Sequence, residues 1–198
     1  MTELTASTAS TASTASPAAG TRTGNGFELR LERGGAHVRL GAPATIAGLP
    51  VTGIGDYAFT ACPELAALSI PSSVTSIGLA AFYGCGTLTQ IALPEGLTNL
   101  GPAAFQNCSS LRSIAIPTGV TAIHPQTFMN CSSLSSLSLP AGLSSIGTAA
   151  FLGCSTLESL TLPATVISLH DGAFLNCTGL KNLYCLGAAP TLGADVFR

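Results

Sequence analysis

Cysteine and histidine are the residues in this 198-residue chain most able to support metal or redox chemistry, and the chain has seven cysteines and three histidines. Zinc sites usually draw on cysteine pairs roughly two to four residues apart. Six of the cysteines here recur every 23 residues, and none has a histidine beside it. This spacing argues against a metal site. These six residues are Cys62, Cys85, Cys108, Cys131, Cys154 and Cys177.

Disulfides between successive cysteines are the second interpretation of this spacing. If the cysteines stack in register, their Cβ atoms stay about 4.8 Å apart, whereas a disulfide needs about 3.8 Å. We therefore predict buried thiols that pack as small hydrophobic side chains. Cys185 is predicted to point inward as well, because it stands in the repeat where other repeats have Leu or Ile. The residues at that position are Ile70, Leu93, Ile116, Leu139 and Leu162.

Serine and threonine are frequent, but a serine nucleophile needs a histidine that is itself oriented by a third group. His124 and His170 stand where other repeats have glycine, and His37 precedes the repeats, so we interpret all three as surface residues. His170 and Asp171 are adjacent, yet no serine or cysteine has a fixed place beside them. We expect no enzymatic activity and no cofactor.

Phenylalanine, leucine and proline recur with the same 23-residue period as the cysteines. One unit of this length cannot bury its own apolar side chains, so successive units must stack as coils of a solenoid, about 4.8 Å apart. Stacking aligns each phenylalanine under the next one, and we predict an internal phenylalanine column. Its members are Phe59, Phe82, Phe105, Phe128, Phe151, Phe174 and Phe197.

Within one coil, Leu68 and Ile70 alternate with small residues, which predicts a half-buried strand ended by Pro71. Val74 and Ile77 predict a corner or a very short second strand, and the segment 79–82 favours a short helical turn. The residue before each repeated cysteine is mostly Gly or Asn, which tolerate a left-handed backbone. The sequence thus predicts an α+β solenoid with a parallel β-sheet face and short helical turns on the opposite side.

The chain divides into four predicted parts. Residues 1–26 form a disordered leader with tandem Thr-Ala-Ser triplets, 27–48 an N-terminal cap hairpin, 49–189 six repeats, and 190–198 a C-terminal half-coil cap. The cap hairpin is predicted from alternating apolar residues in 27–31 and 36–40. The leader lacks the features of an ordinary signal peptide. It is either a solvated spacer or an address for non-classical export.

The residues from Leu65 to Cys85 follow the pattern Leu-x-x-Leu-x-Ile-Pro-x-x-Val-x-x-Ile-Gly-x-x-Ala-Phe-x-x-Cys. This pattern resembles the BspA-type leucine-rich repeat family, and the segments 46–59 and 183–197 resemble the beginning and end of such arrays. The resemblance implies a right-handed coil stack and covers about residues 27–198. It also implies a cell-surface or secreted protein that adheres to host proteins or to other cells, and it assigns no catalytic residue.

Composition limits the kinds of partner. Seven basic and nine acidic residues give no basic face for nucleic acid, and no run approaches the roughly 20 apolar residues needed for membrane insertion. We predict a protein partner of unknown identity that binds the outward strand positions, weakly because these positions are small and uncharged. The predicted partner-binding residues are Gln90, Ser113, Ser136, Ser159, Thr161, Lys181, Asn182 and Tyr184.

Two alternatives to a protein-binding module remain at this stage. The first is a structural rod without a specific ligand that self-associates weakly, for instance through the half-coil at its end. The second is binding to an ice or crystal surface through one column of hydroxyl groups, which is interrupted at Ile167. That column consists of Thr75, Thr98, Thr121 and Ser144.

Overall fold

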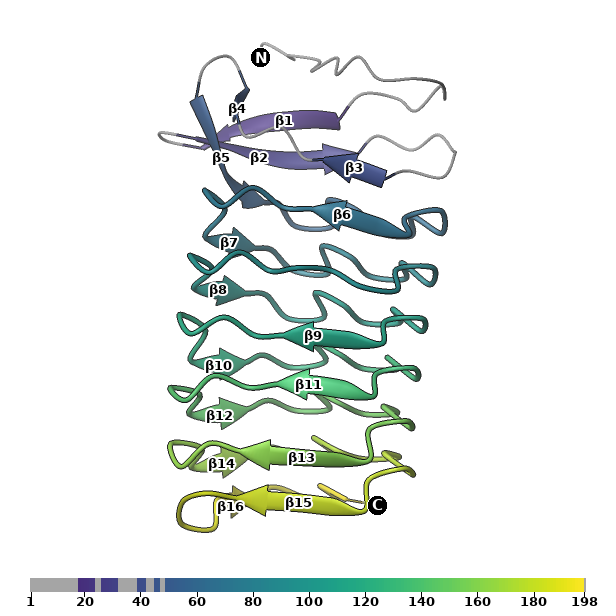
Figure 1. The fold of residues 1–198 in the computed structure, drawn as a ribbon, viewed down its shortest axis with the longest axis vertical. Coiled ribbons are helices and arrows are strands. Elements are labelled where there is room, and N and C mark those ends of the chain that lie inside the picture. Colours follow the sequence, from purple (N-terminus) through teal and green to yellow (C-terminus); the bar gives the residue numbers. More distant parts are fainter. Residues whose placement is uncertain (1–17, 24–25, 32–38, 42–44, 47–48, 198) are drawn as a thin grey trace.

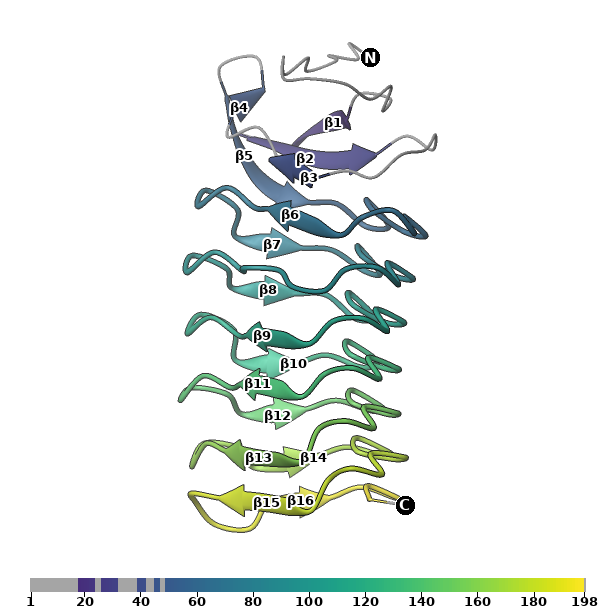
Figure 2. The ribbon, with the colours of Figure 1, turned by 45° about the vertical axis from the view of Figure 1, so that its right-hand side comes forward.

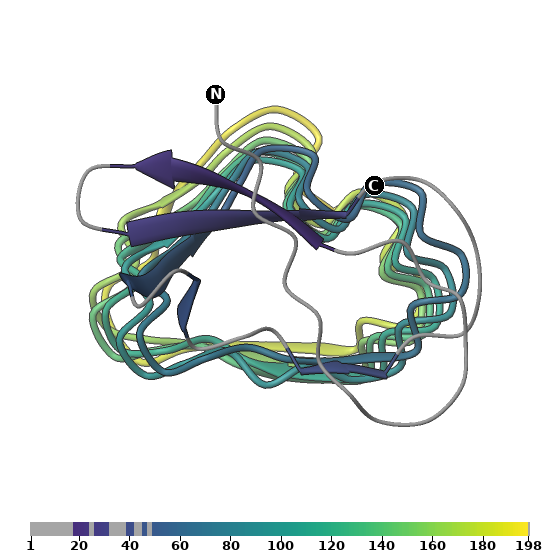
Figure 3. The same cartoon turned by 90° about the horizontal axis from the view of Figure 1, so that it is seen from above.

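The protein is a rod of stacked coils in the computed structural model (Figure 1). The structure describes residues 18–23, 26–31, 39–41, 45–46 and 49–197, with side chains from 49 to 197. Viewed along the rod, the coils superimpose closely on one another (Figure 3). Residues 1–17 of the predicted leader, and His37 with most of the second half of the predicted hairpin, lie outside the described residues.

One long side of the rod is a sheet of short parallel strands. Paired strands are offset by one repeat, so that Leu137 lies beside Ile114 and Leu160 beside Leu183. Isolated bridges join Ser69 to Ala92 and Gln90 to Ser113. We call the outward side of these segments the strand face, and its parallel pairing confirms the prediction. Its strands are β6 (Ala67–Ser69), β9 (Ser113–Ala115), β11 (Ser136–Ser138), β13 (Ser159–Leu162) and β15 (Asn182–Cys185).

A second set of short parallel strands runs along another side of the rod, in two sheets that follow one another (Figure 2). Apart from β5, its strands within the repeats are two residues long, as the corner prediction allows, and all but the last bury one residue, such as Ile77 or Ile146. In the last strand both Thr191 and Leu192 are exposed. We call this whole set of strands the second sheet. Its strands are β5 (Leu49–Ile54), β7 (Ser76–Ile77), β8 (Asn99–Leu100), β10 (Ala122–Ile123), β12 (Ser145–Ile146), β14 (Ser168–Leu169) and β16 (Thr191–Leu192).

The third side of the rod consists of tight turns, and the prediction of helical turns there is wrong. The described residues contain no helix, so the class is an all-β solenoid instead of α+β. The backbone N–H groups of Ala80 and Phe82 donate to carbonyl oxygens of the following coil, at 2.9 and 2.8 Å. A helix would turn these groups back into its own segment. Here, hydrogen bonding between coils prevails over the local helix preference of an alanine-rich sequence.

Two positions in every coil have a left-handed backbone. The first precedes the repeated cysteine, as predicted, with φ between 52° and 74° from Ala61 to Asn176. The second lies two residues before each phenylalanine and was not predicted, because its residue types vary and glycine occupies it only once. Together they reverse the chain direction twice within a few residues. The second column consists of Tyr57, Ala80, Ala103, Gln126, Ala149, Gly172 and Asp195.

The predicted phenylalanine column is confirmed. Ring centroids of neighbouring phenylalanines lie 5.1 to 5.8 Å apart and the rings are nearly parallel, within 7°. Centroid separations above 5 Å with parallel rings correspond to offset stacking. The six rings from Phe59 to Phe174 are fully buried, whereas Phe197 is 49% exposed and has one neighbour in the column. Apolar side chains from both sheets surround this column and complete the core.

The two ends of the rod differ from the repeats. β1 (Ala18–Thr23) pairs antiparallel with β2 (Gly26–Leu31), so the hairpin includes part of the predicted leader, and not the predicted pairing of 27–31 with 36–40. β3 (Arg39–Gly41) instead runs parallel to β6. β2 runs parallel to β5, and β4 (Thr45–Ile46) pairs antiparallel with β5. β2 and β3 therefore continue the parallel stack ahead of the first repeat.

Cys185 is exposed, and the prediction that it is buried is wrong. Its strand position does align with Leu162, which is buried in the preceding coil. The difference arises because β15 lies in the last described coil, where no further coil covers it (Figure 1). In the described part of the chain, no helix has the length and apolar character of a membrane span.

Candidate functional site

The buried cysteines form a hydrogen-bonded column beside the phenylalanines. The Cys131 thiol donates to the backbone oxygen of Phe105 at 3.1 Å, and Cys85, Cys108, Cys154 and Cys177 each contact the phenylalanine of the preceding coil in the same way. All five are free and buried, as predicted, whereas Cys62 in the first coil is only partly buried, so the prediction is wrong for that residue. The thiols therefore link neighbouring coils as well as filling the core.

Burial also suppresses the reactivity of these thiols. Loss of solvation on burial, with the nearby Cys62 as a smaller contribution, raises the pKa of Cys85 to about 12. Burial likewise raises the pKa of Cys177 to about 11 and that of Cys131 well above the ordinary thiol value. Since the thiolate is the nucleophile and the metal ligand, this column is poorly suited to either role.

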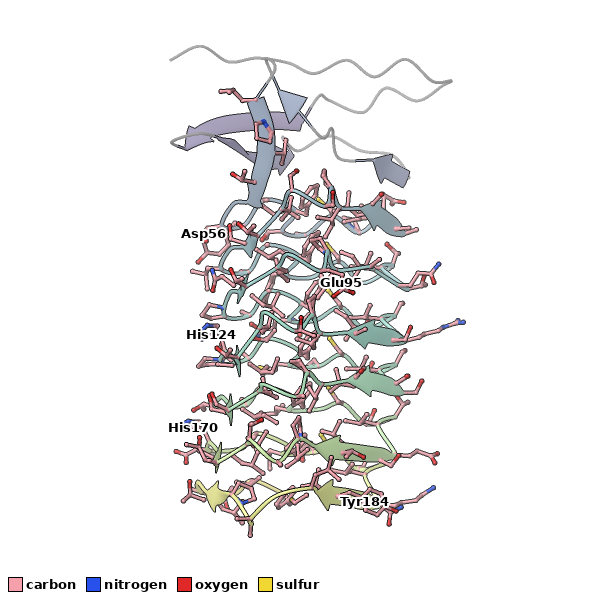
Figure 4. All side chains as sticks on the ribbon, turned by 60° about the vertical axis from the view of Figure 1, so that its left-hand side comes forward. Asp56, Glu95, His124, His170 and Tyr184 are labelled. Atoms are coloured by element: carbon pink, nitrogen blue, oxygen red, sulfur yellow. The ribbon has the colours of Figure 1, made fainter. Side chains whose placement is uncertain are left out.

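His124 and His170 lie on an edge of the rod away from the labelled Tyr184 on the strand face. Figure 4 shows Asp56, His124 and His170 along this edge. The Asp171 carboxylate accepts the backbone N–H of Ala194 at 2.8 Å, so it holds the next coil. Among the residues that the structure describes, no three His, Cys, Asp or Glu side chains are grouped to hold a metal ion.

A shallow hollow of about 890 Å³ lies on the strand face, over four successive coils. It exists because the outward side chains there are small: alanine at 67, 92 and 115, and serine at 69, 113, 136 and 138. Ala92 and Ala115 are exposed, while the inward-pointing Leu68, Ile91 and Ile114 form the floor. The hollow is lined by residues 66–69, 89–92 and 113–115 together with Ser136 and Ser138.

The structure places all eight predicted partner-binding residues on or beside the strand face, but in two groups. Gln90, Ser113 and Ser136 line the hollow. The other five lie toward the C-terminal end. Ser159 is paired with Asn182, and Thr161 with the exposed Tyr184. Lys181 forms an exposed ion pair with Glu158, with 3.4 Å between Nζ and Oε2.

Sequence reasoning missed the residues that surround this hollow. Thr89 lines the hollow. Arg112 is exposed in the next coil, and its backbone N–H donates to the backbone oxygen of Thr89 at 3.0 Å. Arg112 directly precedes Ser113, another lining residue. The repeat did contain a signal for Arg112. Three residues at its repeat position are charged, and only Glu158 and Lys181 lie in adjacent coils and can neutralise each other. The residues at this position are 66, 89, 112, 135, 158 and 181.

The described residues form a parallel solenoid with 23-residue coils. The sequence profile of the BspA type leucine rich repeat region matches residues 52–181 in six copies. The chain belongs to this family. Proteins built from such repeats generally mediate protein interactions and are generally non-enzymatic scaffolds.

Solved leucine-rich repeat structures agree with this assignment. A T. pallidum leucine rich repeat protein is 37% identical with a TM-score of 0.80, and the match covers 85% of this chain and 78% of that protein. A Bacteroides ovatus leucine-rich repeat protein is 27% identical with a TM-score of 0.67, covering 89% of this chain. One from Eubacterium ventriosum is 30% identical with a TM-score of 0.50, covering 69%.

This chain spans 54% of the Bacteroides ovatus protein and 45% of the Eubacterium ventriosum protein. Comparison with curated proteins gives no match.

Proposed function

We propose that this protein is a non-enzymatic protein-binding module that uses the strand face, in adhesion to a host protein or to another cell surface. The observation that carries the proposal is the hollow over four coils, a concave area on an otherwise regular face. Leucine-rich repeat proteins generally bind other proteins, which supports this proposal. Adhesion and a location at the cell surface or outside the cell are the finer part of it, and rest on what the family resemblance implies.

The composition of the strand face favours weak contacts that gain strength by repetition. Its side chains are mainly serine, alanine and threonine, whereas tight interfaces depend on Trp, Tyr and Arg anchors. Within the described repeats this face carries one large aromatic side chain, that of Tyr184, which is 56% exposed. A display of many copies on one surface would raise the overall avidity without any new contact.

Paired variants test the location. Ser113→Lys with Ser136→Lys places two long cations in the hollow, and Thr98→Lys with Thr121→Lys places the same charges on the outer side of the second sheet. A partner cross-linked to the wild type on intact cells is identified, purified and titrated against all three proteins. We expect binding by the wild type and the second-sheet variant, with loss in the strand-face variant. Equal binding by all three refutes the location.

A second candidate function, a self-assembling rod, is favoured by the apolar end of the last coil. Leu186 is 69% exposed, Leu192 60% and Phe197 49%, a concentration of exposed large apolar side chains in the last described coil. Light scattering over a concentration series tests it. Growth in mass that Leu192→Asp abolishes supports assembly through this end, whereas a constant mass at all concentrations refutes it.

A further inference from the structure

The strand face of the described repeats carries a single unneutralised charge, on Arg112. Residues 49–197 contain two cationic side chains, Arg112 and Lys181. Lys181 is paired with Glu158, whereas the guanidinium of Arg112 forms no ion pair with another residue that the structure describes. The residues that line the hollow next to it are all uncharged. A partner that covers this area therefore meets one positive group beside an apolar depression.

The position of Arg112 connects this charge to the hollow. In its column, Ala66 and Thr89 line the hollow in the two preceding coils, and Ser135 precedes the lining residue Ser136 in the next. The N–H of Ser135 donates to the Arg112 oxygen at 3.0 Å, which holds these coils in register. Arg112 thus stands at the edge of the hollow at mid-length, and its exposed side chain is free to reach a bound chain.

The chemistry of arginine narrows what that chain must offer. A guanidinium presents paired N–H donors in a fixed plane that match the two oxygens of a carboxylate. The hollow beside it offers Ala67, Ala92 and Ala115, which leave room for a larger apolar side chain. At about 4.8 Å per coil, four coils span about 14 Å, the length of roughly four extended residues. Both contacts fit within one short peptide segment.

We infer that the strand face recognises a segment of its protein partner in which an Asp or Glu carboxylate, or a chain-terminal one, pairs with Arg112 while a neighbouring apolar side chain fills the hollow. This inference rests on the proposed function, because it assumes that the strand face is the binding surface. It deepens that function by stating the chemistry of the partner. The specificity comes from one charge, so a change of that charge should change the preferred partner.

A selection from random twelve-residue peptides displayed on phage tests the inference with the full chain. Peptides selected on the wild type should pair an acidic residue with a large apolar residue within about four positions. Selection on Arg112→Glu should instead favour Lys or Arg beside the apolar residue. Such a reversal would not follow from a structural role for Arg112, because a merely destabilised chain has no reason to prefer the opposite charge.

Titration of the selected peptides against matched variants separates the two claims. Arg112→Gln and Asn99→Asp each lower the net charge by one, on the strand face and the second sheet respectively, and Ala92→Trp fills the hollow. We expect Arg112→Gln to weaken binding about tenfold or more, as for a hydrogen-bonded charge pair, and Asn99→Asp to change it less than twofold. Thermal unfolding confirms that each variant is folded.

Three results would contradict the inference in different ways. If Ala92→Trp abolishes binding but Arg112→Gln does not, the strand face binds peptides and the carboxylate preference is wrong. If Ala92→Trp and Arg112→Gln both bind like the wild type, the proposed binding surface is wrong as well. If no peptide is enriched on the wild type relative to Ala92→Trp, both claims fail.

Discussion

Removal of one ring from the middle of the phenylalanine column should destabilise the chain far more than removal of the last ring. Phe128 is fully buried and lies between Phe105 and Phe151, with centroid distances of 5.6 and 5.4 Å. Phe→Ala in a core costs roughly 3–5 kcal/mol, including the cavity. Each stacked pair of rings contributes about 0.5–1.5 kcal/mol, and part of this contribution is already included in that cost. We expect Phe128→Ala to lower the free energy of unfolding by about 4 kcal/mol or slightly more.

Phe197→Ala is the matched comparison at the end of the column. Phe197 is 49% exposed and has a single stacking neighbour, Phe174, at 5.8 Å. Because the ring is only half buried and has one stacking partner, Phe197→Ala should lower the free energy of unfolding by about 1–2 kcal/mol. Phe128→Leu nearly conserves the volume and should cost less than Phe128→Ala, which isolates the effect of the cavity.

Urea unfolding followed by circular dichroism measures these differences. A gap in the middle of a repeat array also weakens the coupling between its two halves, so the Phe128→Ala transition should broaden, with a lower m-value. A loss below about 1.5 kcal/mol, or equal losses for Phe128→Ala and Phe197→Ala, would refute the claim that stacking on both sides stabilises the core.

Three further predictions concern the backbone and the thiols. Gly101→Ala should cost about 1–3 kcal/mol because its Cβ would lie 2.6 Å from the Gly78 carbonyl carbon, whereas Gly142→Ala, with nothing within 4 Å, should cost less than about 0.5 kcal/mol in the same urea assay. Ala149→Gly should stabilise the chain by about 0.5–1 kcal/mol in thermal unfolding, because Ala149 has a φ of 53°; destabilisation would show that its methyl group packs usefully. Burial raises the pKa of Cys85 to about 12 and that of Cys177 to about 11, against about 9 for an ordinary thiol. The unfolded chain releases these thiol protons first, so the free energy of unfolding should fall above about pH 9, by roughly 1.4 kcal/mol per pH unit for each buried thiol. Urea midpoints measured from pH 8 to 10.5 check this, and the dependence should be shallower in Cys131→Ala; an equal slope would contradict it.

The sequence predicted those parts of the fold that depend on the period. Once Phe59 and Phe82 are in register, stacking requires the phenylalanine column, the parallel strand face and the buried cysteines. The turn side was predicted wrongly because residues 79–82 have a good local helix propensity, and propensity does not include hydrogen bonds to the next coil. The backbone of Ala80 is left-handed despite its side chain, and no residue type signals this.

The sequence predicted which side of the rod carries the candidate site, but not the shape of that site. The alternation around Leu68 and Ile114 identified which residues face outward, and Gln90, Ser113 and Ser136 all line the hollow. The hollow itself depends on how several small side chains from four coils adjoin, which a single coil does not show. The hydrogen bonds of the thiols were also missed, because they join each cysteine to a phenylalanine 26 residues earlier, one period plus three residues.

The hydrogen bonds between coils have a consequence for how such a chain can change its length. Nearly every bond between coils joins groups about one period apart, as in Ser144 to Thr121 and Thr98 to Thr75. A duplication or deletion of 23 residues therefore restores every contact with a new neighbour of the same kind. Loss of a single residue would instead shift all later side chains out of their columns. Genetic variation in this protein should accordingly occur in whole repeats, so that a longer or shorter rod presents the same surface chemistry over a different reach.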